Sequence, residues 1–399
     1  MLEKSKPWLA WTRYFSMTNP GFALCLTYHL PNISGFTLSA HELACYIKTL
    51  GYPVKVITGR VPASAPRHEV VDGLEVIRSR PLFRLGKALV MPTYAIDLWR
   101  SLDGIAVVNV HLPCLDAAAV ALVAKLRRRK LIISYVCCMS KARISDRLMR
   151  AVAALSHLVA GLCADAIHVV SSDYAANSTF CRIFRSKLRP APQPVALKLL
   201  PGEVCPPSRM GRPRPPGQPY RIGYVGRIAR QKALGLLFDA IPFLKGGLDA
   251  PFAIELVGPS ADVIGETYWR DILAAAEQSG GTVRYRDALT GHALADFYRS
   301  LDVLVLPSVD RLEAFGGVQV EAMLRRVPVV ASDLPGMRMA VASTGMGKLF
   351  RPGDPKALAS AIIDVLTNGP ERELDAASLE ALFGNHVACA PYVEILQSI

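Results

Sequence analysis

The sequence predicts an α/β protein made of two doubly wound domains, each built on a parallel sheet. Short apolar runs rich in β-branched residues alternate with segments of helical periodicity from about residue 20 to about residue 370. These runs are continuously apolar, which is typical of strands buried on both faces of a parallel sheet. The chain of 399 residues is also long enough for two cores, because a single core rarely grows beyond about 250–300 residues.

Helix signals and apolar runs place the elements of the first half of the chain. Ser39 and Glu42 have the spacing of a capping box, and Gly51 supplies the left-handed residue that commonly ends a helix. The most apolar stretch, 151–164, is too short to cross the ~30 Å of hydrocarbon in a bilayer, so it predicts a buried core helix. The strands expected here are 22–27, 54–57, 105–110, 131–135 and 166–170.

A cluster of seven prolines between residues 197 and 219 interrupts this alternation. Proline breaks helices and central strands, so we interpret the cluster as an interdomain linker. The pattern restarts with strands expected at 221–225, 252–257, 303–306 and 327–331. The sequence therefore predicts domains over 1–200 and 220–375, a linker over 201–219 and a final segment over 376–399.

The net charge of +13 is concentrated in the first half of the chain. Residues 1–200 hold 26 Lys and Arg against 11 Asp and Glu, or +15, whereas residues 201–399 hold 20 against 22, or −2. A solvated helix end would explain the densest cluster, Lys125–Lys130, but not the whole imbalance. No nucleic-acid-binding motif accompanies the charge, so we expect no nucleic acid partner. An anionic membrane surface, or a phosphorylated or lipid-linked substrate, fits better.

The nine cysteines are odd in number, scattered and without C-x-x-C spacing, which predicts neither a disulfide framework nor a zinc site. Residues 1–11 lack the apolar run of a signal peptide. Together these features favour a reducing, cytoplasmic location. The positive charge of the first half is compatible with a peripheral position at the inner face of the membrane.

Loops that follow predicted strands carry the residues best suited to chemistry, because parallel sheets bind ligands at the carboxyl ends of their strands. In the first loop, 31–37, Gly35 allows the backbone to approach a phosphate closely. In the second, Gly226 ends a strand, and Arg227 and Lys232 could direct two cations at a diphosphate. Either loop taken alone could equally be an ordinary surface turn.

The third loop, residues 307–317, is the most specific of the three. Gly316 and Gly317 expose backbone N–H groups at the start of the following helix, which favours an anion. Glu313 precedes that helix and Glu321 lies about one turn inside it, so both carboxylates could face one ligand. Carboxylates accept hydrogen bonds strongly from sugar hydroxyls, often from two at once.

Glu313 and Glu321 are spaced as E-x7-E. With the loop Gly226–Lys232 and the segment 333–336, this spacing resembles the retaining GT-B glycosyltransferases of family 4, also called group 1. The likeness is strongest over 220–366 and extends through nearly the whole chain. It implies two Rossmann-like domains that face a central cleft, the first of which holds the acceptor. It also implies a nucleoside-diphosphate sugar as co-substrate, with no metal or other cofactor.

The resemblance further implies a role for each matching residue. Arg227 and Lys232 would neutralise the donor diphosphate, Glu321 would hold the ribose hydroxyls, and Glu313 would bind the transferred sugar. The last segment, 383–399, resembles the helix that crosses back onto the first domain. The other positions with which the family binds the donor correspond here to Gly35, Gly226, Ala288, Phe315, Gly316, Gly317 and Val318.

The sequence departs from that family at two places. After the predicted strand 131–135 the family often carries a His-x-Asp segment that faces the transferred sugar, whereas residues 136–138 here are Val-Cys-Cys. His111 could supply the missing contact, or it could be a satisfied core histidine. The cysteines are more simply read as buried and inert than as nucleophiles. Asp287 stands where the family has a glycine, beside Ala288, which would lie against the base.

The sequence thus predicts a metal-independent, retaining hexosyltransferase with an unidentified acceptor, a lipid-linked or other glycoconjugate being favoured. In a front-face displacement the leaving phosphate takes the acceptor proton, so the paired carboxylates of a glycosidase are not needed. Two alternatives stay open: a nucleotide-sugar epimerase, and a nucleotide-sugar-binding protein with reduced or lost turnover. A dinucleotide oxidoreductase is disfavoured because no G-x-G-x-x-G follows any predicted strand.

Overall fold

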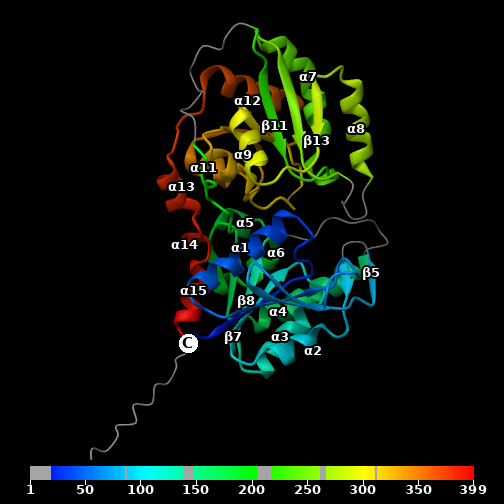
Figure 1. Ribbon diagram of the computed structural model, residues 1–399, viewed down its shortest axis with the longest axis vertical. Coiled ribbons are helices and arrows are strands. Elements are labelled where there is room, and N and C mark those ends of the chain that lie inside the picture. Colours follow the sequence, from blue (N-terminus) through cyan, green and yellow to red (C-terminus); the bar gives the residue numbers. More distant parts are fainter. Residues whose placement is uncertain (1–18, 86–87, 138–146, 205–216, 261–266, 311) are drawn as a thin grey trace, which may run out of the picture.

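The chain folds into two lobes, each built on a parallel sheet with helices against it (Figure 1). The computed structural model describes residues 19–85, 88–137, 147–204, 217–260, 267–310 and 312–399. All described strands of the first sheet come from residues 21–190, and those of the second from residues 220–350. The predicted pair of parallel α/β domains is therefore confirmed. Most of the predicted proline-rich linker, residues 205–216, lies outside the described residues.

The first sheet contains β1 (Gly21–Cys25), β2 (Val54–Gly59), β3 (His68–Val71), β4 (Leu74–Ser79), β7 (Ile105–Leu112), β8 (Lys130–Tyr135), β9 (Ala166–Val169) and β10 (Leu188–Pro190). Its order is β10-β9-β8-β7-β1-β2-β4-β3, and the described pairings are parallel except β3 with β4. The strand order reverses between β1 and β7, which are neighbours. A separate hairpin is formed by β5 (Phe83–Leu85) and β6 (Ala88–Val90).

Helices cover both faces of this sheet. Those of the first lobe are α1 (Gly35–Thr49), α2 (Tyr94–Ser101), α3 (Ala117–Leu126), α4 (Arg147–Cys163), α5 (Ser172–Ala176) and α6 (Thr179–Ile183). α2, α3 and α4 pack on one face, in a core that includes Leu98, Val120 and Ala160. α1 packs on the other face, where it meets the last helix of the chain, α15 (Ala390–Gln397).

The second sheet contains β11 (Tyr220–Val225), β12 (Phe252–Val257), β13 (Val283–Arg286), β14 (Val303–Leu306), β15 (Val329–Ser332) and β16 (Gly347–Phe350). Its order is β13-β12-β11-β14-β15-β16, with parallel pairing throughout the described strands. The order reverses between β11 and β14. One face is covered by α7 (Gly235–Gly247), α8 (Tyr268–Gln278) and α12 (Pro355–Asn368). The other is covered by α9 (Gly291–Ser300), α10 (Val318–Leu324), α11 (Met339–Thr344) and α13 (Ala376–Phe383).

The predicted start of the first helix is wrong by five residues. The N-cap is Ser34, not Ser39: the Ser34 hydroxyl accepts from the N–H of Thr37 at 3.2 Å, and the Thr37 hydroxyl accepts from the Ser34 N–H at 2.8 Å. This reciprocal pair uses Thr where Glu or Gln is usual, so the pattern was not recognised. Gly35 consequently lies in the first turn of α1 rather than in the loop before it, and Ser39 is buried inside the helix. Gly51 follows the helix in a left-handed conformation with φ +88°, as predicted.

The prediction that 151–164 forms a buried core helix is only half right. This stretch lies in α4, and its inner face packs on α3: the Ser156 hydroxyl accepts from the N–H of Ala118 at 2.9 Å and donates to the carbonyl of Leu115 at 2.7 Å. Its outer face, however, exposes several leucines to solvent. Within the described ranges, no helix combines the length and apolar character that crossing a membrane requires.

The chain returns to the first lobe at its C-terminal end (Figure 1). Instead of one helix, the segment after Phe383 forms α14 (Asn385–Ala388) and α15. The Asn385 amide donates to Oε1 of Glu42 at 2.6 Å, and the hydroxyls of Tyr392 and Ser134 lie 2.6 Å apart on the first sheet. Tyr392 also packs edge-on against Phe22. These contacts attach the end of the chain to the lobe in which it begins.

Tyr392→Ala should lower the free energy of unfolding by about 3–5 kcal/mol, because it leaves a cavity beneath α15. Tyr392→Phe should cost only about 1 kcal/mol, since it removes the hydroxyl but keeps the packing. Chemical denaturation measures both, with the exposed Glu394→Ala as a control that should stay within about 0.5 kcal/mol of wild type. Equal midpoints for Tyr392→Ala and wild type would show that α15 contributes nothing to stability.

Candidate functional site

The candidate residues lie where each sheet reverses its strand order. In the second sheet β11 and β14 are neighbours at the reversal; Gly226 and Arg227 follow β11, and the loop 307–317 follows β14. In the first sheet β1 and β7 are neighbours; Gly35 lies beyond the end of β1, and His111 is near the end of β7. Open α/β sheets bind ligands outside the carboxyl ends of the strands at such a reversal.

A tight turn after β11 presents Arg227. Gly226 has φ +149°, and a Cβ at this position would lie 2.7 Å from the hydroxyl oxygen of Tyr224, so the turn requires glycine. The Tyr224 hydroxyl donates to the Arg227 carbonyl at 2.9 Å, which fixes the backbone of the turn. Arg227 is half-buried, and no partner of its guanidinium is recorded among the described residues. Such a cation can accept an anionic ligand without first breaking an ion pair.

Lys232 and Glu313 form an ion pair, although they lie 81 positions apart in the sequence. Lys232 ends a 3-10 turn, Arg230–Lys232, after which Ala233 adopts a left-handed conformation with φ +49°. The two side chains are only 16% and 13% exposed, so salt screens their attraction less than it would on the surface. The fold thus brings the loop after β11 and the loop after β14 into direct contact.

The start of α10 presents unpaired backbone donors. Gly316 has φ +72°, and the Gln319 amide donates to the carbonyls of Phe315 at 2.7 Å and Met337 at 3.0 Å, which holds this turn in place. The first N–H groups of a helix have no intrahelical acceptor. Accordingly, no acceptor is recorded among the described residues for the N–H groups of Gly316, Gly317 and Val318. The Phe315 side chain is buried and packs against Phe383, so only its backbone could contact a ligand.

Glu321 is held by a network that the sequence did not reveal. Its Oε2 accepts a hydrogen bond from the hydroxyl of Tyr298 at 2.9 Å. Burial raises the pKa of the Glu321 carboxyl, while the Tyr298 hydrogen bond and the charge of Arg325 oppose that rise. Arg325 also donates to the Glu321 carbonyl at 3.0 Å and binds both carboxylate oxygens of Glu203, at 2.8 and 3.0 Å. Glu321 therefore has a fixed position and oxygen lone pairs to spare for further donors.

The segment that follows β10 connects the first lobe to this site. The carbonyl of Gly35 accepts from the amide of Gln193 at 3.3 Å. Two residues further on, Val195 lies so close to Gly317 that an added Cβ would be 3.1 Å from its side chain. The start of α1 and the start of α10 are therefore linked through one short stretch of chain, which places Gly35 on the side of the first lobe that faces the second.

His111 is buried, and neither of its ring nitrogens has a hydrogen-bond partner among the described residues. The rings of Phe36 and His111 pack edge-on, with their centroids 5.6 Å apart. Burial lowers the pKa of His111 to about 3, so its imidazole is neutral. Of the residues that replace the family's His-x-Asp segment, Val136 is buried and Cys137 is partly buried, while Cys138 lies outside the described residues. A buried imidazole without partners is costly, which favours a polar ligand at this position over a satisfied core histidine.

Ala288 lies on an exposed loop after β13, the edge strand of the second sheet, and not after a strand of the reversal. Its N–H donates to Oδ1 of Asp287 at 2.7 Å, and the hydroxyl of Tyr285 lies 3.3 Å from the same oxygen. That hydroxyl donates to the carbonyl of Gly258 at 2.9 Å, on the loop after β12. The assignment of Ala288 to a nucleotide base stays a prediction.

Direct contacts also join the loops of the two lobes. Asp173, in α5, accepts from the N–H of Gly336 at 2.8 Å and pairs with Arg338 at 3.3 Å. Arg338 in turn pairs with Asp333 at 3.0 Å. A Cβ on Gly336, which has φ +81°, would lie 2.2 Å from the carbonyl oxygen of Ala314, so this loop packs tightly beneath the loop 307–317.

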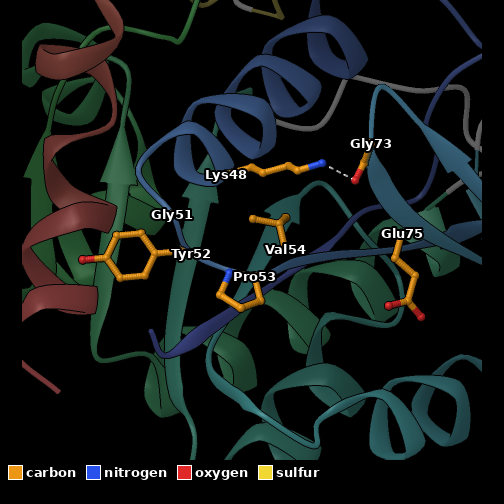
Figure 2. A pocket seen from close by; sticks show the side chains of 7 residues that line it. All are labelled: Lys48, Gly51, Tyr52, Pro53, Val54, Gly73 and Glu75. Carbon is orange, nitrogen blue, oxygen red and sulfur yellow. Dashed lines mark hydrogen bonds between the residues drawn. The ribbon is translucent and has the colours of Figure 1, made fainter. Parts of the chain in front are cut away.

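A shallow depression elsewhere on the surface lacks these features. It measures about 390 Å³ and lies at the amino ends of β2 and β4, whereas the candidate site lies at the carboxyl ends of the strands. Figure 2 shows Lys48 reaching to the carbonyl of Gly73, and Val54 and Glu75 also line the depression. Because parallel sheets bind ligands at the carboxyl ends of their strands, we do not assign the main site here.

Comparison with protein families agrees with the geometry. The model of the family Glycosyl transferases group 1 matches residues 219–368, and that of the Glycosyl transferase 4-like domain matches residues 34–194. Together they cover most of the chain. The chain belongs to the group 1 glycosyltransferase family. The group 1 model spans all described strands of the second sheet, and the 4-like model spans those of the first sheet except β1.

Individual relatives match over part of their length. D-inositol 3-phosphate glycosyltransferase of Stackebrandtia nassauensis is 34% identical over 161 residues, which cover 39% of this chain and 36% of that protein. Phosphatidyl-myo-inositol mannosyltransferase of Mycobacterium leprae is 32% identical over 192 residues, which cover 46% of this chain and 48% of that protein. The matched region thus spans between about a third and a half of these curated relatives.

Solved glycosyltransferase structures share the whole fold. Sucrose-phosphate synthase from Thermosynechococcus elongatus has a TM-score of 0.67 at 18% identity, covering 95% of this chain and 98% of that chain. Anabaena HepE in complex with UDP-glucose also has a TM-score of 0.67, at 16% identity, covering 95% of this chain and 100% of that chain. These proteins are GT-B glycosyltransferases, so the predicted GT-B fold is confirmed.

Within this glycosyltransferase fold, the site includes residues that the sequence did not single out. Tyr298 holds Glu321, Gln193 binds the backbone of Gly35, and Asp173 joins the lobes through Gly336. Ser171 caps α5 and Asp173 lies in its first turn, a pattern common at helix starts, but the contact of Asp173 with Gly336 leaves no signal in the sequence. Tyr298 lies on α9, in an ordinary amphipathic pattern, and no sequence signal distinguishes it from a core residue.

Lys232 and Glu313 should be energetically coupled, so that removing both side-chain charges costs less stability than the sum of the two single removals. Lys232→Met or Glu313→Gln should each cost about 1–3 kcal/mol, because each leaves a shielded, unpaired charge. The double variant should cost at least about 1 kcal/mol less than the sum. Denaturant titration of the four proteins measures this coupling, and additive effects would show that the two charges do not interact.

Proposed function

We propose that the protein is a retaining glycosyltransferase that moves a sugar from a nucleoside-diphosphate sugar to an acceptor held by the first lobe. The observation that carries this proposal is the set of groups gathered at the β11–β14 reversal. They are the Lys232–Glu313 pair, together with the guanidinium of Arg227 and the N–H groups of Gly316–Val318, which have no partner among the described residues. Cations and backbone donors of this kind bind a diphosphate, while Glu313 and Glu321 suit sugar hydroxyls.

The diphosphate is proposed to lie against Arg227, Lys232 and the start of α10. As the bond to the sugar breaks, negative charge grows on the leaving phosphate and positive character grows on the sugar. Donors fixed in place before the reaction stabilise that charge without reorganising, and removal of one such donor typically lowers the rate by about 10²–10³-fold. Lys232 and Arg227 supply positive charge themselves, so the proposed reaction needs no divalent cation to neutralise the leaving group.

Glu321 is proposed to bind the two hydroxyls of the donor ribose. Its carboxylate accepts only one hydrogen bond among the described residues, from Tyr298, and therefore retains acceptor sites. Because burial raises its pKa, donor affinity should weaken in mild acid, where Glu321 becomes protonated and loses part of this capacity. Tyr298 and Arg325 act by fixing the position of Glu321.

Glu313 is proposed to exchange Lys232 for sugar hydroxyls, at least in part, when the donor binds. The freed ammonium then faces the diphosphate, so one ion pair serves both halves of the ligand. In a front-face displacement, the acceptor attacks from the side of the leaving phosphate, and that phosphate takes the proton. The configuration at the anomeric carbon is thereby retained without a covalent intermediate.

The acceptor is proposed to be anionic or lipid-linked, and the enzyme to work in the cytoplasm at the inner face of the membrane. The charge of +15 over residues 1–200 supports this assignment, since the first lobe would hold the acceptor. The names of two relatives, D-inositol 3-phosphate glycosyltransferase and phosphatidyl-myo-inositol mannosyltransferase, each include a phosphorylated inositol. An acceptor with a phosphate group is consistent with both observations.

A second candidate function is binding of the nucleotide sugar without turnover. The observation that favours it is the loss of the His-x-Asp segment, replaced here by residues 136–138. His111 is the group best placed to compensate. It lies near the end of β7, which pairs with β8, and β8 ends at Tyr135 just before the replaced segment. Its ring nitrogens have no partner among the described residues. The role of His111 therefore decides between the two candidates.

A panel of UDP-, GDP-, ADP- and TDP-sugars should reveal the donor by thermal shift. A ligand at about 100 times its Kd adds about 2.7 kcal/mol, which raises the melting temperature by a few degrees. The shift should disappear in Glu321→Ala and shrink in Arg227→Met. The exposed Arg270→Met, on α8, serves as a control and should keep the wild-type shift. A folded protein that no nucleotide sugar stabilises would contradict the proposed function.

His111→Leu should stabilise the free protein and impair turnover. The substitution removes two buried polar atoms that have no partner among the described residues, which should add about 1–3 kcal/mol to the free energy of unfolding. If the ring binds the transferred sugar, kcat/KM should fall by at least about tenfold. A destabilised variant with unchanged kcat/KM would instead make His111 a core residue, and wild-type protein that binds donor without turnover would support the second candidate.

A further inference from the structure

Over residues 151–163, the outer face of α4 is apolar. Between residues 151 and 163, each residue that the structure places as exposed is alanine, valine or leucine. Leu155 and Leu162 are the most prominent, with 63% and 65% of their surface exposed, and Val152 and Leu158 complete the row. These positions recur at helical spacing, so they form one continuous stripe along the helix. A surface helix normally carries charged or polar residues on its solvent side.

The orientation of α4 is fixed by polar groups on its inner face. Ser156 is hydrogen bonded to the backbone at Leu115 and Ala118, and the ring of His157 lies 3.2 Å from the backbone nitrogen of Cys114. Rotation of the helix to bury the leucines would break these bonds and expose Ala160, which lies in the core beneath it. The apolar stripe is therefore a stable feature of the surface.

Neighbouring helices extend the apolar surface. α3 packs beside α4 and α2 beside α3, and both lie at the end of the first lobe that is remote from the second lobe (Figure 1). α3 exposes Leu126, with 72% of its surface accessible, and Leu122, while α2 exposes Trp99 and Ile96. A shallow depression of about 280 Å³ lies between α2 and α3, lined by Ala95, Ile96, Trp99, Arg100 and Val123. We call the solvent side of α2, α3 and α4 the outer helical face.

Cations stand at the edge of this face. The end of α3 and the turn after it, Lys125–Lys130, contain five Lys and Arg residues. Arg127 stacks on Trp99, with its Cζ 4.9 Å from the ring centroid. On the other side of α4, the segment 182–189 carries four more, of which Lys187 donates to the carbonyls of Gly161 and Leu162 at the end of the helix. Two carboxylates lie among these cations, Asp103 and Asp165, and each is already paired.

We propose that the outer helical face docks on the surface of an anionic lipid bilayer, with the leucines of α4 inserted at the level of the acyl boundary. Apolar rows flanked by Lys and Arg bind membranes in this way, and tryptophan favours the interface. The positive rim supplies the complementary charge. A symmetric contact between two copies of the chain would instead bring these two rims of like charge together.

An acidic protein partner would satisfy the charges but not the shape of the face. The stripe on α4 consists of aliphatic side chains without hydrogen-bonding groups, and the depression between α2 and α3 is shallow. Interface cores between proteins favour aromatic side chains and deep complementary pockets. The inference uses the proposed function only in expecting a membrane-borne acceptor; the surface itself is independent of the donor site.

Vesicle co-sedimentation of the full chain tests the proposal. Vesicles of phosphatidylcholine with ~30% phosphatidylglycerol should bind the wild type, and binding should fall at least tenfold between ~0.05 and ~0.5 M salt. Leu155→Gln/Leu162→Gln keeps good helix formers and should reduce binding at least about tenfold. The matched control is Phe243→Gln/Leu382→Gln, which alters two exposed apolar residues of the second lobe and should bind like wild type.

Three results would overturn the proposal. The first is wild type that does not sediment with anionic vesicles at low salt, and the second is a Leu155→Gln/Leu162→Gln variant that binds them unchanged. The third is a wild-type dimer, seen by light scattering, that this variant converts to monomer, since the face would then be a protein interface. Donor thermal shift on the same variant separates this failure from failure of the proposed function, because the shift should equal that of wild type.

Discussion

The structure depends on one constraint: the carboxyl edges of its two parallel sheets must face each other. Asp173 maintains this arrangement by accepting a hydrogen bond across the junction from the N–H of Gly336. The segment that holds Gln193 and Val195 adds a second link, because Gln193 binds the carbonyl of Gly35 and Val195 lies against Gly317. The end of the chain reinforces it, because α15 is attached to the first sheet through the hydroxyls of Tyr392 and Ser134. Every loop with candidate chemistry follows a strand toward this junction, which is why residues from distant parts of the chain form one site.

Within that arrangement, electrostatics distinguish the second lobe from the first. At the β11–β14 reversal the fold keeps Lys232 against Glu313 while no partner of Arg227 is recorded among the described residues, so the local charge suits a diphosphate carrying a sugar. The first lobe carries nine other Lys and Arg residues around the outer helical face, in the segments 125–130 and 182–189. The same chain thus has two regions that favour anions, one for a soluble ligand and one for an extended surface.

The sequence was sufficient for the fold class, because continuous apolar strands and a proline cluster reflect how parallel sheets are buried and connected. The E-x7-E spacing also identified Glu313 and Glu321 as candidates, because both lie in one short segment that joins a loop to the helix after it. Their roles stay predictions. Contacts between distant loops, such as Asp173 with Gly336, leave no local signal. The helix start at Ser34 was missed because Thr replaced the usual capping partner, and the exposed face of α4 was missed because its composition is that of a core helix. Strand β3 lacks a continuous apolar run because it forms the edge of the sheet and alternates exposed with half-buried residues. In β4 the apolar run is interrupted by Arg78, which is buried and paired with Glu69 of β3.

The central claim is that a nucleoside-diphosphate sugar binds at the β11–β14 reversal. A crystal structure of the protein with a non-transferable analogue of the donor found by thermal shift tests it most directly. The account predicts a diphosphate within hydrogen-bonding distance of Arg227, Lys232 and the N–H groups of Gly316–Val318, and ribose hydroxyls on Glu321. A diphosphate bound elsewhere, for instance among the cations of the turn after α3, would contradict it.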